Sequence, residues 1–226
     1  MNKIGMISLG CPKNQVDSEM LLSSLCDEGF QIVPEAEQAD VVIINTCGFI
    51  DDAKKEAIDN ILYAAELKND GVIKGIVVTG CLAERYKEEV MNEIPDVDAC
   101  IGIGANGKIA EVCRQVLKGE SCALFPSKYD LSLDGGRMLT TPPHWAYIKI
   151  AEGCSNCCTY CAIPSIRGKF RSRAMESIIA EAEDLAKGGI KELIVIAQDI
   201  TRYGTDLYGK RSLARLCREL SKIDGI

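Results

Sequence analysis

The sequence predicts an α/β protein in which a parallel sheet, covered by helices on both faces, is followed by the first part of a (β/α) barrel. Two observations support this prediction. Short apolar runs alternate with amphipathic helical patterns as far as Phe125, and a second alternation begins at Trp145. Strands that are separated by helices pair in parallel, and helices then cover the faces of the sheet.

The expected strands of the first half share an unusual ending. Three apolar runs lead directly into cysteines, namely Cys11, Cys47 and Cys81. The carboxyl ends of parallel strands lie along one edge of a sheet, which is the edge where open α/β sheets bind ligands. We therefore expect these three thiols to lie close together although they are far apart in the sequence.

Helices are expected at 17–28, 84–93 and 108–118, with a longer helix after Cys47. The longer helix carries an apolar stripe at the spacing of one helical face. The stripe consists of Ala53, Ala57, Ile58, Ile61, Leu62 and Ala65. Charged residues such as Asp59 and Glu66 are expected to point away from it.

The pattern predicts three parts: a first domain at 1–125, a linker at 126–143 and a partial second domain at 144–226. The linker is rich in Ser, Asp, Gly and Pro and has no periodicity. The second domain supplies about two βα units, whereas a complete barrel takes about 250 residues. We therefore expect a truncated barrel and a chain that is a fragment of a longer protein.

The composition favours a reducing compartment. The 226 residues include 12 cysteines and 47% hydrophobic residues, and the formal net charge is −7. There is no apolar run long enough for a secretory leader or a membrane span, so we expect a cytoplasmic protein with reduced thiols. The acidic balance disfavours DNA and favours a basic partner.

A second group of cysteines follows the first expected strand of the barrel. Cys154, Cys158 and Cys161 form a CxxxCxxC triplet, and Cys157 adds a thiol next to Cys158. Two triplets without an obvious fourth ligand indicate two iron-sulfur clusters, each with one open iron. Structural zinc, which usually takes four ligands, remains the alternative. Tyr160 stands where an aromatic ring can pack beside a cluster.

The basic residues cluster once, directly after this triplet. The cluster comprises Arg167, Lys169, Arg171 and Arg173. Such a run is usually a solvated loop, but its position makes contact with a substrate or cofactor equally plausible.

The cysteine motifs resemble those of a known family. The segment 153–161 resembles the signature of radical S-adenosylmethionine enzymes, and Gly10-Cys11, Thr46-Cys47 and Gly80-Cys81 are similar to the first domain of their methylthiotransferase branch. Within that branch, segments 10–19, 45–50 and 162–173 resemble the enzymes that modify a ribosomal protein more than those that modify tRNA.

The resemblance implies a flavodoxin- or Rossmann-like first domain and a radical S-adenosylmethionine barrel. It also implies two 4Fe-4S clusters, an auxiliary one on Cys11, Cys47 and Cys81 and a radical one on Cys154, Cys158 and Cys161. Bound S-adenosylmethionine would yield a radical that activates the substrate carbon for sulfur insertion. Cys157 departs from the family pattern and could compete as a ligand.

The implied substrate is an aspartate of ribosomal protein S-twelve, with an electron donor and a sulfur source as further partners. Two alternatives stay open: a tRNA adenosine methylthiotransferase, and a non-catalytic iron-sulfur or zinc protein. Gln198 follows the second expected barrel strand, at the edge where barrel sites lie, and is expected to contact the cofactor together with Tyr160. Asp199 next to it is equally plausible as a helix cap.

Overall fold

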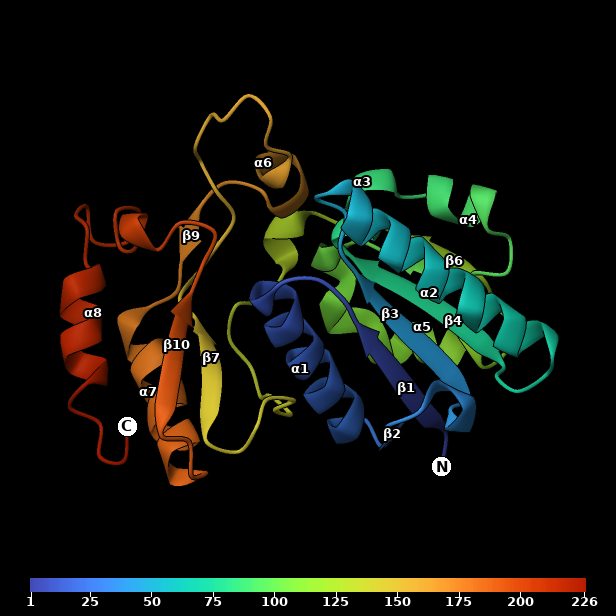
Figure 1. Ribbon diagram of the computed structural model, residues 1–226, viewed down its shortest axis with the longest axis horizontal. Helices are drawn as coiled ribbons and strands as arrows, with labels where there is room; N and C mark the ends of the chain where they lie inside the picture. Colours follow the sequence, from blue (N-terminus) through green and yellow to red (C-terminus); the bar gives the residue numbers. More distant parts are fainter. The chain divides into compact units, whose positions relative to one another are not determined.

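The computed structural model describes residues 1–226 (Figure 1). The chain divides into two compact units. The first unit consists of Met1–Ser132 and Gly136–Met138, and the second of Leu133–Gly135 and Leu139–Ile226.

The first unit is built on a six-stranded parallel sheet with the strand order β2-β1-β3-β4-β5-β6. This is the order of flavodoxin-like folds, extended by one strand. The strands are β1 (Lys3–Ser8), β2 (Gln31–Val33), β3 (Val41–Thr46), β4 (Gly75–Gly80), β5 (Ala99–Ile101) and β6 (Cys122–Leu124).

Helices cover both faces of this sheet, so its strands are buried on both faces. In β3, Val42 and Ile44 join the core beneath α2, α3 and α4, whereas Val41 and Ile43 join the core beneath α1 and α5. The helices are α1 (Pro12–Asp27), α2 (Asp51–Asn69), α3 (Cys81–Tyr86), α4 (Glu89–Glu93) and α5 (Ile109–Val116). Short 3-10 turns lie at Ala36–Gln38, Ile103–Lys108 and Lys128–Asp130.

Three details differ from the expectation. Helix α1 begins at Pro12 and not near 17, since a proline at the first helical position loses no intrahelical bond. The helix expected at 84–93 is divided into α3 and α4 at Lys87, whose φ is 51°. The stripe on α2 is not wholly buried: Ile58 and Leu62 are 42% and 46% exposed.

The second unit contains two short sheets (Figure 1). Strands β7 (Trp145–Lys149) and β10 (Glu192–Ile196) pair in parallel, and β8 (Ala151–Glu152) and β9 (Arg171–Ser172) pair antiparallel. The helices are α6 (Ile163–Arg167), α7 (Met175–Lys187) and α8 (Leu213–Leu220), with a 3-10 turn at Ile200–Arg202. The two parallel strands with α7 and α8 confirm the predicted α/β class and the two βα units.

The core of the second unit lies between its parallel strands and these two helices. Ile148 of β7, Ile178 of α7 and Leu216 of α8 are fully buried there, together with Tyr203. No helix of the structure combines the length and apolar character that crossing a membrane requires.

Candidate functional site

The three strands that lead into the first cysteine triplet are neighbours in the sheet. β1 pairs with β3, and β3 pairs with β4. In their register, Ser8 lies beside Asn45, and Asn45 lies beside Thr79. The turns that carry Cys11, Cys47 and Cys81 therefore leave one edge of the sheet at adjacent positions, as the sequence predicts.

Two glycines allow these turns to approach closely. A Cβ atom built on Gly10 would lie 2.6 Å from the Cβ of Cys47 and 3.2 Å from its Sγ. One built on Gly48 would lie 2.7 Å from the Cα of Leu82 and 3.1 Å from the carbonyl carbon of Cys81. Real Cβ atoms essentially never come within 3.0 Å of such neighbours, so a side chain at either position would push the turns apart. The first turn thus touches the second, and the second touches the third.

Buried amide side chains fix the first two turns to each other. Asn14, in the first turn of α1, donates its side-chain Nδ2 to the carbonyl oxygen of Leu9 at 2.7 Å and to that of Asn45 at 3.2 Å. Asn45 donates its Nδ2 to the carbonyl oxygen of Asn14 at 2.9 Å and to Ser18 Oγ at 2.8 Å. Asn14 and Asn45 are both 1% exposed, so these bonds satisfy polar groups that water cannot reach.

The second and third turns are fixed in a similar way. Thr46 Oγ1 donates to the carbonyl oxygen of Thr79 at 2.5 Å, and Arg85 Nη1 donates to the carbonyl oxygen of Gly48 at 2.9 Å. Gly80 has φ 93°, a conformation that favours glycine, and it turns the chain from β4 directly into Cys81 at the start of α3.

The second triplet is anchored at its first member. Cys154 is buried, and its N–H donates to the carbonyl oxygen of Gly168 at 3.0 Å. Cys158 is exposed, and Cys161, which is half-buried, donates its N–H to the carbonyl oxygen of Cys158 at 3.1 Å. Cys157 is exposed beside them. In neither triplet do the side chains already form a group of three that could hold a metal ion.

A buried carboxylate joins the two ends of this cysteine loop. Glu152 is fully buried, and its Oε2 lies 3.0 Å from Lys149 Nζ and 3.4 Å from Arg167 Nη1. Its Oε1 accepts the N–H of Gly153 at 3.0 Å and the side-chain Nε2 of Gln198 at 2.5 Å. One carboxylate therefore contacts the residue before Cys154, the helix after Cys161 and the end of β10.

Two opposing effects set the charge of this group. Burial by itself raises the pKa of Glu152. The charges of Lys149 and Arg167 and the hydrogen bonds from Lys149 and Gly153 have the larger, opposite effect, so the pKa is lowered to about 2. Glu152 is therefore ionised and balances part of the positive charge around it.

Gln198 has a polar atom without a partner. Its Oε1 is buried and accepts no hydrogen bond. The carboxylate of Glu152 fixes the amide orientation, because the Nε2 group, and not the oxygen, must face it. Gln198 therefore presents an unused acceptor at the end of β10. Asp199 caps the following turn: its Oδ1 accepts the N–H of Thr201 at 3.1 Å.

Tyr160, the other residue expected to bind the cofactor, is 86% exposed at the tip of the loop. The loop before it is held to the end of β10, since Asn156 Nδ2 donates to Asp199 Oδ2 at 3.1 Å and Arg202 Nη1 donates to Asn156 Oδ1 at 3.2 Å.

The basic run is not a uniformly solvated loop. Arg167 is 1% exposed against Glu152, and Arg173 is 5% exposed and pairs with Glu181 at 2.6 Å and Asp134 at 2.7 Å. These two cations are structural, because their guanidinium groups are used inside the unit.

The remaining cysteines do not form a third group. Burial raises the pKa of both Cys100 and Cys113 to about 12, so they remain thiols and pack as small apolar side chains. Cys26 and Cys122 are half-buried, and Cys217 is exposed.

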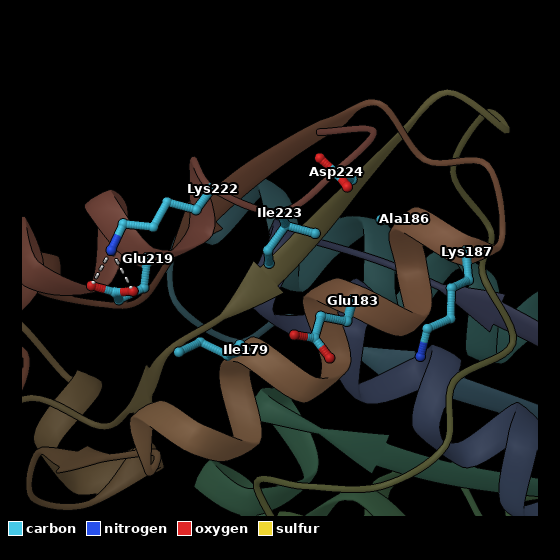
Figure 2. Close-up of a pocket in the computed structure, with 8 residues that line it drawn as sticks. All are labelled: Ile179, Glu183, Ala186, Lys187, Glu219, Lys222, Ile223 and Asp224. Carbon is cyan, nitrogen blue, oxygen red and sulfur yellow. Dashed lines mark hydrogen bonds and ion pairs between the residues drawn. The ribbon is translucent and has the colours of Figure 1, made fainter.

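A hollow of about 450 Å³ in the second unit contains none of the predicted site residues (Figure 2). It lies between Ile179 and Lys187 on α7 and Lys222 and Ile223 after α8. Helix α7 ends just before β10 begins, so the hollow lies at the amino end of the strand, opposite to the cysteine loop. In barrels the active site lies at the carboxyl ends of the strands, so this hollow is not a candidate for it.

Comparison with known proteins agrees with the two halves of the chain. Residues 3–102 match the uncharacterized protein family UPF0004, and residues 148–224 match the Radical SAM superfamily. The fold resembles the radical S-adenosylmethionine methyltransferase TsrM from Kitasatospora setae, with a TM-score of 0.65 at 12% identity over 99% of this chain and 54% of that one. For the cobalamin-dependent enzyme OxsB the TM-score is 0.57 at 12% identity, over 98% of this chain and 37% of that one.

These matches define a class for the second half of the chain: residues 148–224 are similar to the Radical SAM superfamily. The chain's curated relatives are ribosomal protein uS12 methylthiotransferases called RimO. The chain is 53% identical to the one from Clostridium botulinum and 54% identical to the one from Caldanaerobacter subterraneus, over 99% of this chain. The chain is thus similar over nearly its whole length to methylthiotransferases, which confirms the resemblance in its motifs. The chain spans about half the length of these relatives, 50% and 51% respectively.

Proposed function

We propose that this chain supplies the cluster-binding and cofactor-binding parts of a methylthiotransferase that modifies an aspartate of ribosomal protein uS12. The observation that carries the proposal is the meeting of three cysteine turns at adjacent strand ends, with Gly10 and Gly48 permitting the approach. A second cysteine triplet in the other unit provides the second site that such a reaction requires.

The residues fit the implied groups. Three thiols on three turns suit a 4Fe-4S cluster, because thiolates are its usual ligands, and the same holds for Cys154, Cys158 and Cys161. The unused acceptor of Gln198 suits a cofactor that carries hydrogen-bond donors, as S-adenosylmethionine does through its ammonium and hydroxyl groups. When bound, the clusters and S-adenosylmethionine supply an electron, a hydrogen-abstracting radical and sulfur.

The protein's own residues have three tasks in this scheme. Cys11, Cys47 and Cys81 hold the auxiliary cluster, and the bonds between Asn14 and Asn45 keep the first two turns in place before it binds. The carboxylate of Glu152 secures both ends of the second cysteine loop and orients Gln198. Such fixed positions matter because a small displacement of the reacting groups lowers the reaction rate strongly.

The substrate is inferred from the relatives. Sequence identity of 47 to 54% to RimO proteins over nearly the whole chain favours uS12 over tRNA. The net charge of −7 agrees with a ribosomal protein, which must itself be basic to bind RNA. We propose an electron donor and a sulfur source as further partners and the cytoplasm as the compartment, which a ribosomal substrate and reduced thiols support.

The test uses a protein that continues this sequence to the length of its relatives. After anaerobic reconstitution it is incubated with S-adenosylmethionine, sulfide, a reductant and either uS12 or tRNA, and both products are analysed by mass spectrometry. We expect a methylthio group on an aspartate of uS12 and none on tRNA. A methylthio group on a tRNA adenosine, with uS12 unchanged, would reject the substrate and retain the cluster sites.

A further inference from the structure

The first unit has an apolar groove beside its cysteine edge. The groove has a volume of about 230 Å³ and lies between α2 and the pair α3 and α4. Its floor is formed by Ile61, Leu82 and Val90, which are 0%, 4% and 7% exposed. Small-molecule pockets usually measure about 300 to 1,000 Å³, so this volume suits one or two side chains of a protein partner better than a separate ligand.

Exposed apolar side chains lie on α2 and directly before it, and one of them, Ile58, lines the groove. Three apolar side chains are largely exposed: Ile50 at 54%, Ile58 at 42% and Leu62 at 46%. Ile58 and Leu62 lie four positions apart on α2 and so share one face of the helix, and Ile50 is the residue just before the helix. Apolar side chains that gather on a surface in this way commonly mark an interaction site.

The rim of the groove is acidic. Glu89 and Glu93 lie one helical turn apart on α4 and form no ion pair. The one cation of the lining, Lys54, is already paired with Asp51 at 2.6 Å. The groove therefore offers two free carboxylates beside an apolar floor, which is complementary to a segment with both basic and apolar side chains.

The groove is joined to the candidate cluster site through Leu82. This residue lines the groove, follows Cys81 directly, and its backbone is the one that Gly48 approaches. A partner held in the groove would therefore lie beside the turns of Cys47 and Cys81.

We infer that this groove docks the basic protein substrate through a segment that places apolar side chains on the floor and a cation between Glu89 and Glu93. The inference rests on the proposed function, since the partner is taken to be uS12. It adds the surface by which the substrate is recognised, next to the first cysteine edge.

The experiment measures the dissociation constant of uS12 from the 226-residue chain and from two groove variants. Ile58→Asp places a charge on the apolar wall, and the double variant Glu89→Lys with Glu93→Lys reverses the rim. The three residues that are changed all have exposed side chains, so the fold is expected to persist. Circular dichroism checks this. We expect binding to weaken at least tenfold in each, with a smaller salt dependence for the double variant.

Matched controls separate the groove from general effects. Val72→Asp changes an apolar residue that is 45% exposed outside the groove, and Glu56→Lys with Asp59→Lys makes the same change in net charge on exposed positions of α2. The controls should bind within twofold of the unchanged chain. Equal binding by the groove variants and the controls would overturn the inference. Modification of uS12 in the functional assay together with that result would leave the proposed function intact.

Discussion

Asn14 and Asn45 exchange hydrogen bonds across the first cysteine edge. The side-chain amide of Asn14 donates to the carbonyl oxygen of Asn45 at 3.2 Å, and the side-chain amide of Asn45 donates to the carbonyl oxygen of Asn14 at 2.9 Å. Neither side chain is accessible to water. The turn that carries Cys11 and the turn that carries Cys47 are thereby held together by the protein itself.

This arrangement predicts that Asn45→Ala lowers the free energy of unfolding by about 2 kcal/mol, because buried backbone and hydroxyl groups lose their partner. Urea unfolding followed by far-UV circular dichroism measures the change. Asn92→Ala, an exposed amide on α4, serves as the control and should shift the free energy by less than about 0.5 kcal/mol. An equal effect of both variants would argue against a special role of the pair.

Gly48 tests the close approach of the second and third turns. Gly48→Ala puts a Cβ 2.7 Å from the Cα of Leu82, so the backbone has to move and the turns of Cys47 and Cys81 should separate. We expect the loss of iron bound at the first site, measured after anaerobic reconstitution. Gly107→Ala is the matched control, since no atom lies within 4 Å of the added Cβ, and it should bind as much iron as the unchanged chain.

Glu152 should contribute strongly to the stability of the second unit. In Glu152→Gln, Lys149 and Arg167 remain buried without their counter-charge, which is expected to cost about 3 kcal/mol. Trp145 in β7 is the only tryptophan, so its fluorescence during urea unfolding reports on this unit. The exposed change Glu183→Gln on α7 should have little effect. Similar unfolding midpoints for the two variants would contradict the account.

The same carboxylate gives a pH dependence with a definite sign. The folded-state pKa of Glu152 is lowered to about 2, below its ordinary value of 4.5. Its contribution is therefore fully present above pH 4.5 and is lost as the pH falls toward 2. The difference in stability between the unchanged chain and Glu152→Gln should be constant near neutral pH and shrink in this acid window. A difference that grows on acidification would contradict the assigned charge state.

Gln198 is expected to act on cofactor binding and not on cluster binding. Gln198→Ala removes the unused acceptor and should weaken S-adenosylmethionine binding about tenfold, the worth of one hydrogen bond, while the iron content stays the same. Equilibrium binding to the reconstituted chain measures the effect, with the exposed Gln38→Ala as the control. Unchanged affinity would remove Gln198 from the site.

The sequence was sufficient to predict the first cysteine edge, because the signals for it are local. Three apolar strands, β1, β3 and β4, lead into Cys11, Cys47 and Cys81, and parallel pairing then places their ends together. The neighbours that hold the edge were not predictable in the same way. Asn14 and Asn45 are 31 positions apart, and only the presence of a polar residue near the end of an apolar strand marked Asn45.

Contacts in the second unit show the same limit. Lys149 and Glu152 are three positions apart, a spacing that in a continuous strand puts side chains on opposite faces. They meet because the chain breaks between β7 and β8. Likewise Arg137, in the segment expected to be a linker, pairs with the buried Glu19 at 2.6 Å, which no local pattern indicates.

The central claim is that Cys11, Cys47 and Cys81 form one iron-sulfur site and Cys154, Cys158 and Cys161 another. The iron content of the anaerobically reconstituted chain and of its single Cys→Ala variants tests this claim most directly. We expect about eight irons in the unchanged chain and roughly half after the loss of any one of the six thiols, because each cluster depends on its own ligands. Cys157→Ala and Cys113→Ala should keep the full content. Stoichiometric zinc without iron, or loss of one cluster in Cys157→Ala, would contradict the assignment.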